Sequence, residues 1–208
     1  MNAMTLIKMQ LELECIGVDS DNGLVRIPGP DPDDIARVYA FYSEDQYWVF
    51  FRHDLPPSIQ KQLRELPAEK VFRDHQGIKM ILATAGAGVT VGHYQSYLFP
   101  DGLNPHQFSD VVEQVQDGRR EYAIIQGGKV VSVCRSVREN DRAGECYVFT
   151  EPAYRGRSYA RQTTAAWAYH LQQSGKIPFY SHTHDNHASK GVASSLGLIP
   201  CFALVNYD

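Results

Sequence analysis

One stretch of the sequence decides the fold: Val148-Phe149-Thr150-Glu151-Pro152-Ala153-Tyr154-Arg155-Gly156-Arg157-Ser158-Tyr159-Ala160. It starts in an expected strand over 145–150, passes through a turn with Pro and Gly, and enters an expected helix over 158–174. The first N–H groups of a helix have no partner inside the helix, and the helix dipole makes this end partly positive. Two arginines beside Gly156 add full positive charge. The stretch therefore predicts a cradle for phosphate or pyrophosphate.

The flanking sequence predicts a mixed α and β fold around one sheet. Gly127 and Gly128 supply the positive φ angles of a tight hairpin between strands over 121–125 and 129–134. After the cradle, the pattern predicts a strand, a short helix and a strand over 177–183, 186–196 and 199–205. Before the hairpin it predicts a helix over 106–116 that ends at Asp117-Gly118, and, further upstream, helices over 31–42 and 57–65 and strands over 46–52 and 89–99.

The stretch over 148–160 resembles the central motif of the GCN5-related N-acetyltransferase (GNAT) superfamily. In that motif a strand and a Pro lead to Arg/Gln-x-x-Gly-x-Gly/Ala at the start of a long helix. Two later segments, Asn186-His187-Ala188-Ser189 and Leu196-Gly197-Leu198, resemble the family's Asn-x-x-Ser/Ala and Leu-Gly-Phe. The resemblance covers 106–208, the C-terminal half. It implies an α/β (α+β) fold: a GNAT-like mixed, mostly antiparallel sheet flanked by helices, with an N-terminal α/β accessory region.

The resemblance also implies two regions and a cosubstrate. We expect an acceptor-side α/β region over 1–105 and an acetyl-CoA-binding core over 106–208, divided at a turn-rich stretch that ends at Pro105. Acetyl-CoA is expected between the strand over 145–150 and its neighbour from Ile177, with the pantetheine on the strand backbone and the diphosphate on the helix amides. The cofactor-binding residues expected from the family motif are Val148, Thr150, Arg155, Gly156, Arg157, Ser158, Tyr159, Ala160, Arg161, Asn186 and Ser189.

The reaction implied by the resemblance is direct transfer of the acetyl group to an amine, either a small molecule or a peptide. Glu145 and Glu151, at the two ends of the strand, are the candidate bases; as strand-end carboxylates, they can equally be solvated surface groups. The sequence departs from the family at two positions. Ser158 replaces the second loop Gly, so that its Cβ can crowd the ligand or its hydroxyl can contact a phosphate. Ala193 stands where many members carry a Tyr as general acid.

Two other functions stay open. The departures at Ser158 and Ala193 are compatible with an acyl-CoA-binding module that has lost catalysis. The sequence His182-Thr183-His184-Asp185-Asn186-His187 invites a metallohydrolase interpretation, because strand residues two apart share a face and imidazoles bind zinc. The family of metal-dependent hydrolases that it resembles needs further His and Asp ligands downstream, but no His follows His187. We therefore expect no metal.

The amino-acid composition limits the classes of binding partner and the cellular compartment that we expect for this protein. Lys and Arg number 20 against 24 Asp and Glu, so a basic surface for nucleic acid or anionic membrane is not expected. Four cysteines without short spacing suit a reducing cytoplasm, and the longest strongly apolar run, 47–51, is too short to span a membrane. We expect a cytoplasmic enzyme without a signal peptide, and leave a homodimer open.

Overall fold

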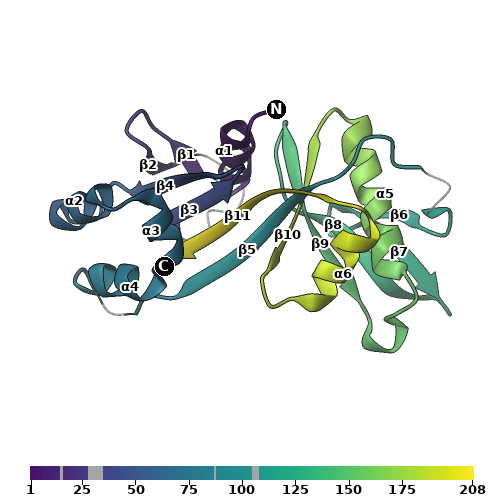
Figure 1. The fold of residues 1–208 in the computed structure, drawn as a ribbon. Helices are drawn as coiled ribbons and strands as arrows, with labels where there is room; N and C mark the ends of the chain where they lie inside the picture. Colours follow the sequence, from purple (N-terminus) through teal and green to yellow (C-terminus); the bar gives the residue numbers. More distant parts are fainter. Residues whose placement is uncertain (15, 28–34, 87, 105–107) are drawn as a thin grey trace. The chain divides into compact units, whose positions relative to one another are not determined.

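Residues 97–200 fold around a mostly antiparallel sheet covered by helix α5 (Tyr159–Gln173; Figure 1). The computed structural model describes residues 1–14, 16–27, 35–86, 88–104 and 108–208. The described chain separates into two compact units, 1–96 with 201–208 and 97–200. These two units are defined by packing alone, which says nothing about their roles. The acceptor-side role expected for 1–105 and the cofactor-binding role expected for 106–208 therefore stay predictions.

The unit over 97–200 contains the predicted cradle. Strands β6 (Val112–Gln116), β7 (Arg119–Gln126), β8 (Lys129–Glu139) and β9 (Ala143–Thr150) are antiparallel neighbours, and β10 (Ile177–Thr183) pairs parallel with β9. Helix α5 (Tyr159–Gln173) packs on β7 to β10, and α6 (His187–Ser195) packs on β10 and α5.

An apolar cluster under α5 holds this unit together. Trp167 is fully buried beside Phe99 and Tyr180, and its indole N–H donates to Ser136 Oγ at 2.9 Å. This bond satisfies the polar atom of a buried ring. The middle of α5 is buried on every side, because the residues over 163–168 are all buried and span more than one helical turn. The core thereby fixes the start of α5 against the end of β9.

The other unit is also a sheet with helices. Its strands are β1 (Ile16–Val18), β2 (Gly23–Arg26), β3 (Val38–Ser43), β4 (Gln46–Arg52), β5 (Val91–Leu98) and β11 (Ile199–Tyr207), in the order β1-β2-β4-β3-β11-β5. Its helices are α1 (Ala3–Leu13), α2 (Pro57–Glu65), α3 (Ala68–Arg73) and α4 (His75–Ala83). Both units together confirm the expected class, a mixed α and β fold with a mostly antiparallel sheet flanked by helices.

Two expected helices are wrong in whole or in part. Strand β3 occupies 38–43, where its aromatic residues pack in the sheet; the start of the expected helix, 31–34, lies outside the described residues. Strand β6 occupies 112–116, while 106 and 107 also lie outside them. Asp117 and Gly118, expected to end a helix, have φ angles of 50° and 75° and form the hairpin turn to β7.

The remaining expectations for the C-terminal half are confirmed. The hairpin turns at Gly127 and Gly128 with φ angles of 56° and 77°. Helix α5, β10, α6 and β11 lie where the pattern predicts them. In the described part of the chain, every helix is too short or too polar to span a membrane.

Candidate functional site

The site lies where β9 and β10 part. Their parallel pairing runs from Ile177 opposite Ala143 to Phe179 opposite Glu145, whereas β9 continues to Thr150 and β10 to Thr183. On its other side, β9 stays paired with β8 as far as Thr150. The end of β9 therefore turns one edge toward a gap, and a sheet edge can accept an extended ligand as an additional strand.

The loop after β9 turns the chain directly into α5. A short 3₁₀ turn over Pro152–Tyr154 is followed by Gly156 with φ 75° and Ser158 with φ 62°. Gly adopts this left-handed conformation without cost, whereas Ser158 adopts it with a Cβ in place. The N–H of Gln162 donates to Ser158 O at 3.1 Å and begins the helical bonding. Intrahelical bonding therefore leaves the N–H groups of Tyr159, Ala160 and Arg161 unused.

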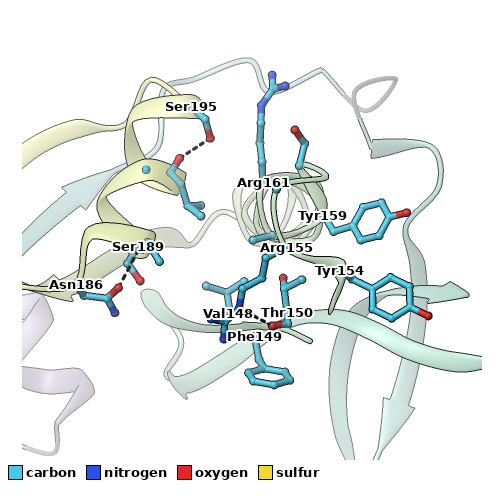
Figure 2. A pocket seen from close by; sticks show the side chains of 16 residues that line it. Val148, Phe149, Thr150, Tyr154, Arg155, Tyr159, Arg161, Asn186, Ser189 and Ser195 are labelled. Atoms are coloured by element: carbon cyan, nitrogen blue, oxygen red, sulfur yellow. Dashed lines mark hydrogen bonds between the residues drawn. The ribbon is translucent and has the colours of Figure 1, made fainter. Parts of the chain in front are cut away.

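A cavity of about 600 Å³ opens between this loop, the end of β9 and α6 (Figure 2). This volume lies within the range of small-molecule sites. Figure 2 shows Asn186, the N-cap residue of α6, and Ser189 of α6 on one side and Val148 and Thr150 of β9 on the other. The lining residues are Val148, Phe149, Thr150, Tyr154, Arg155, Gly156, Ser158, Tyr159, Ala160, Arg161, Asn186, Ala188, Ser189, Gly191, Val192 and Ser195.

Most of the residues predicted to bind a cofactor come together in this cavity. Those that line it are Val148, Thr150, Arg155, Gly156, Ser158, Tyr159, Ala160, Arg161, Asn186 and Ser189. Arg157 is not part of the lining; its guanidinium lies over the Tyr154 ring, 5.2 Å from the centroid. It therefore stands behind a residue of the wall rather than in it.

The two candidate carboxylates are not part of the lining. Glu145 is buried near the start of β9 and accepts a hydrogen bond from Arg138 Nη1 at 3.3 Å. Glu151 is exposed at the other end, where its backbone N–H donates to Val131 O at 2.9 Å. Neither side chain is brought to the cavity wall, and their catalytic roles stay a prediction.

The cavity is electropositive at the start of α5. Arg155 and Arg161 both line it, and no Asp or Glu is among the lining residues that the structure describes. Arg155 Nε donates to Thr150 O at 3.2 Å, which ties the loop back to the strand. Two guanidinium groups beside unused helix amides form a site that favours a multiply charged anion.

Asn186 both caps α6 and lines the cavity. Its Oδ1 accepts the N–H of Ser189 at 3.0 Å, which is an ordinary helix N-cap. Ser158 occupies the N-cap position of α5, but its side chain makes no capping hydrogen bond. Its hydroxyl is therefore not committed to capping the helix, and the residue lines the cavity.

Several lining residues were missed from the sequence. Ala188, Gly191, Val192 and Ser195 follow the i, i+3, i+4, i+7 spacing of one helix face. In a helix over 186–196 that carries Ser189 toward the ligand, this spacing indicates which helix face lines the site. Phe149 and Tyr154 flank predicted residues but carry no signal of their own.

The three histidines at the end of β10 and just after it lie in different surroundings. His182 is buried, and its two ring nitrogens contact Thr183 O at 2.8 Å and Tyr97 Oη at 3.1 Å. His184 and His187 are exposed. Within the ranges the structure describes, no three His, Cys, Asp or Glu side chains are arranged to hold a metal ion.

Comparison with known proteins identifies the family. The sequence model of the family described as GNAT acetyltransferase matches residues 95–204, slightly more than half of the chain. No curated protein matched the sequence. A GNAT-family acetyltransferase from Colwellia psychrerythraea is 10% identical with a TM-score of 0.50, over 92% of this chain and 79% of that one. A GCN5-related N-acetyltransferase-like protein from Streptococcus suis is 15% identical with a TM-score of 0.50, over 83% and 84%.

At such low identity these two structures establish the fold alone, but the family match covers the parting strands, the loop and both cavity helices. The predicted resemblance is thereby confirmed, and the chain belongs to the GNAT acetyltransferase family.

Proposed function

We propose that the protein is an N-acetyltransferase that moves the acetyl group of acetyl-CoA directly to an amine. The observation that carries this proposal is the coincidence of a freed β9 edge and an electropositive helix start in one cavity. A pantetheine arm is extended and carries amides, and a diphosphate is a multiply charged anion. The cavity offers a matching surface to each part.

The residues of the cavity divide between these two parts of acetyl-CoA. The backbone of Val148 and Thr150 pairs with the pantetheine amides, and Asn186 contacts the arm from the opposite wall. The amides at the start of α5, with Arg155 and Arg161, hold the diphosphate. Arg157 contacts Tyr154 of the lining but does not line the cavity itself, so we expect it to contribute less to diphosphate binding than Arg155 and Arg161.

The chemistry follows from this placement. A neutral amine attacks the thioester carbonyl and the C–N bond forms. The nitrogen then loses a proton, and the C–S bond breaks so that the CoA thiolate leaves and takes up a proton. Positioning the two reactants is the largest contribution that a rigid site of this kind makes, because it replaces a bimolecular encounter. A backbone N–H near Thr150 is suited to the developing oxyanion, as it lies on the freed strand edge.

A second candidate is an acyl-CoA-binding module without catalysis. Ala193, where many members of the family carry a Tyr, is 2% exposed in the core cluster and supplies no acid. Both candidates require acetyl-CoA to bind, and only the first requires turnover.

Calorimetry with acetyl-CoA, followed by a free-thiol assay, separates the two. We expect one binding site per chain and thiol release with at least one member of a panel of spermidine, kanamycin, lysine and an unblocked tetrapeptide. Binding without thiol release would support the binding module. Absence of binding would refute both.

A further inference from the structure

Tyr97 of β5 and His182 of β10, both in the unit over 97–200, form a hydrogen-bonded pair. Their rings stack with centroids 5.4 Å apart and planes inclined by 30°. His182 Nδ1 lies 2.8 Å from Thr183 O, and a carbonyl oxygen can only accept. The network therefore assigns the proton of neutral His182 to Nδ1, so that Nε2 accepts the hydrogen bond that Tyr97 O–H donates at 3.1 Å.

This pair is joined to the wall of the cavity by a shared acceptor. Thr183 O, which holds His182, also accepts the N–H of Asn186 at 3.0 Å, and Asn186 lines the cavity. Tyr180, on the same face of β10 as His182, donates from its hydroxyl to the backbone oxygen of Ser189 at 3.2 Å. Ser189 also belongs to the lining. Hydrogen bonds of β10 residues thus connect the pair to Asn186 and Ser189 of the wall, although neither ring of the pair lines the cavity.

The cavity itself offers no group to accept a proton near neutral pH. Its lining, as far as the structure describes it, contains no His, Asp, Glu, Lys or Cys. An acceptor amine is protonated in water at pH 7 and must lose a proton to attack. A side-chain base for the reaction is therefore sought outside the lining, and His182 is an imidazole connected to Asn186 of the lining through Thr183 O.

The side chains of Tyr97 and His182 differ in their exposure to solvent. His182 is 6% exposed, whereas Tyr97 is only partly buried. Of the two partners that the ring nitrogens of His182 contact, only the Tyr97 phenol can carry a proton to the imidazole. The titratable side chains facing His182 are Tyr97 from β5 and Tyr180 from β10. Burial raises the pKa of Tyr180, which keeps it neutral; Asp185, in the following turn, is exposed and interacts with His184 and His187.

We propose, on the basis of the acetyl transfer proposed above, that Tyr97 and His182 form its proton relay. The acceptor ammonium gives a proton to Tyr97 Oη while the phenolic proton moves to His182 Nε2. The neutral amine then forms the C–N bond, the nitrogen of the tetrahedral intermediate loses its second proton to solvent, and the C–S bond breaks to release CoA thiolate. The imidazolium donates to Thr183 O and Tyr97 Oη, and its extra proton returns through Tyr97 to the thiolate. Protons and charge balance over the cycle, and His182 acts as a positioning residue through Tyr97.

The variants Tyr97→Phe and His182→Gln test this relay. Phe keeps the ring stack, and the Gln amide oxygen can still accept from Tyr97 but does not titrate. We expect kcat to fall about 100-fold in each, the range for a lost acid–base group. The KM for acetyl-CoA and the calorimetric affinity stay unchanged. In His182→Gln the acidic limb of the kcat pH profile disappears.

The chain supplies a matched control. Tyr169 and His170 form a second Tyr–His ring pair, with centroids 5.5 Å apart, on the same unit and outside the cavity lining. Tyr169→Phe and His170→Gln should keep the wild-type rate and pH profile. The rate is measured with the fastest amine of the panel, or as hydrolysis of acetyl-CoA where no amine reacts, because water attack uses the same base.

Wild-type rates and an unchanged pH profile in both Tyr97→Phe and His182→Gln would overturn the relay while leaving acetyl transfer intact. Failure of the wild-type chain to bind acetyl-CoA would instead refute the proposed function. The ¹⁵N NMR spectrum of the wild-type imidazoles tests the relay without requiring an active variant. The His182 signal is assigned as the one that is lost in His182→Gln. We expect His182 as the Nδ1–H tautomer, shifted by acetyl-CoA; an Nε2–H tautomer that acetyl-CoA leaves unshifted would contradict the relay.

Discussion

Arg155 Nε donates to the backbone oxygen of Thr150 at 3.2 Å, so the loop that leaves β9 is held to the strand by a side chain of the cavity wall. The same guanidinium lines the expected diphosphate site. Arg155 therefore both holds the loop in shape and supplies positive charge to the cavity. Its planar group has enough donors for both.

Arg155→Ala should weaken acetyl-CoA binding about 10- to 100-fold, since a hydrogen bond to a charged group is worth about 1.5–3 kcal/mol. Arg155→Lys should lie between this variant and wild type, because the charge remains but the fork is lost. Calorimetry at low and moderate salt measures both. Arg119→Ala, an exposed arginine of β7 outside the cavity lining, is the control and should bind as wild type does. Equal affinities for all four proteins would contradict the assignment of Arg155.

Ser158→Gly should stabilise the protein by about 1 kcal/mol, because Ser158 holds a φ of 62° that costs a Cβ-bearing residue about that much. Urea unfolding followed by circular dichroism measures the gain. Ser158→Val, which is β-branched, should lose stability at the same position. If Gly proved less stable than Ser, the left-handed conformation at this residue would be in doubt.

The sequence predicts the site better than it predicts the whole fold. The strand, loop and helix over 145–174 obey strong local rules, with a turn rich in Pro and Gly and a helix that follows at once. Asp117-Gly118 serves equally well as a helix end or as a hairpin turn, and only the pairing of β6 with β7 decides between them. The contact of Tyr97 with His182 joins residues 85 positions apart, and no local pattern carries such a pairing.

The ion pair of Glu121 and Arg135 should behave as a buried one. The Glu121 side chain is 4% exposed, and its Oε1 lies 2.6 Å from Arg135 Nη1. Arg135→Met leaves the carboxylate buried without its partner and should cost about 3 kcal/mol. Adding Glu121→Leu should recover most of this loss, since apolar replacement of both partners is nearly neutral.

Arg120→Met is the matched control for that experiment, because Arg120 pairs with Glu113 at 3.3 Å on the exposed surface. It should cost less than about 1 kcal/mol. The free energy of unfolding in urea measures all three variants. Similar losses for Arg120→Met and Arg135→Met would show that burial does not distinguish the two pairs.

Stability should fall as the pH drops below 6.5 because of His75. Burial lowers the pKa of His75 from its ordinary value of 6.5, and the nearby His93 and Lys79 lower it further against the opposing effect of Asp74. The folded chain therefore binds fewer protons than the unfolded chain between the lowered pKa and 6.5, so stability rises with pH across that window. His75→Asn keeps a donor toward Tyr207 Oη, 3.0 Å from His75 Nδ1, and should flatten the dependence.

Thermal unfolding midpoints between pH 5 and 7.5 measure this effect. His184→Asn, an exposed histidine of the other unit, is the control and should follow the wild-type curve. A His75→Asn curve as steep as that of wild type would assign the pH dependence to other groups.

The proposed function depends above all on the amides at the start of α5, which are expected to hold the diphosphate of acetyl-CoA. Amide hydrogen exchange with and without saturating acetyl-CoA tests it directly. We predict that exchange slows over 156–161, with the exposed strand β6 unchanged as an internal reference. Binding of acetyl-CoA that leaves exchange over 156–161 unaltered would show that these amides do not hold the diphosphate.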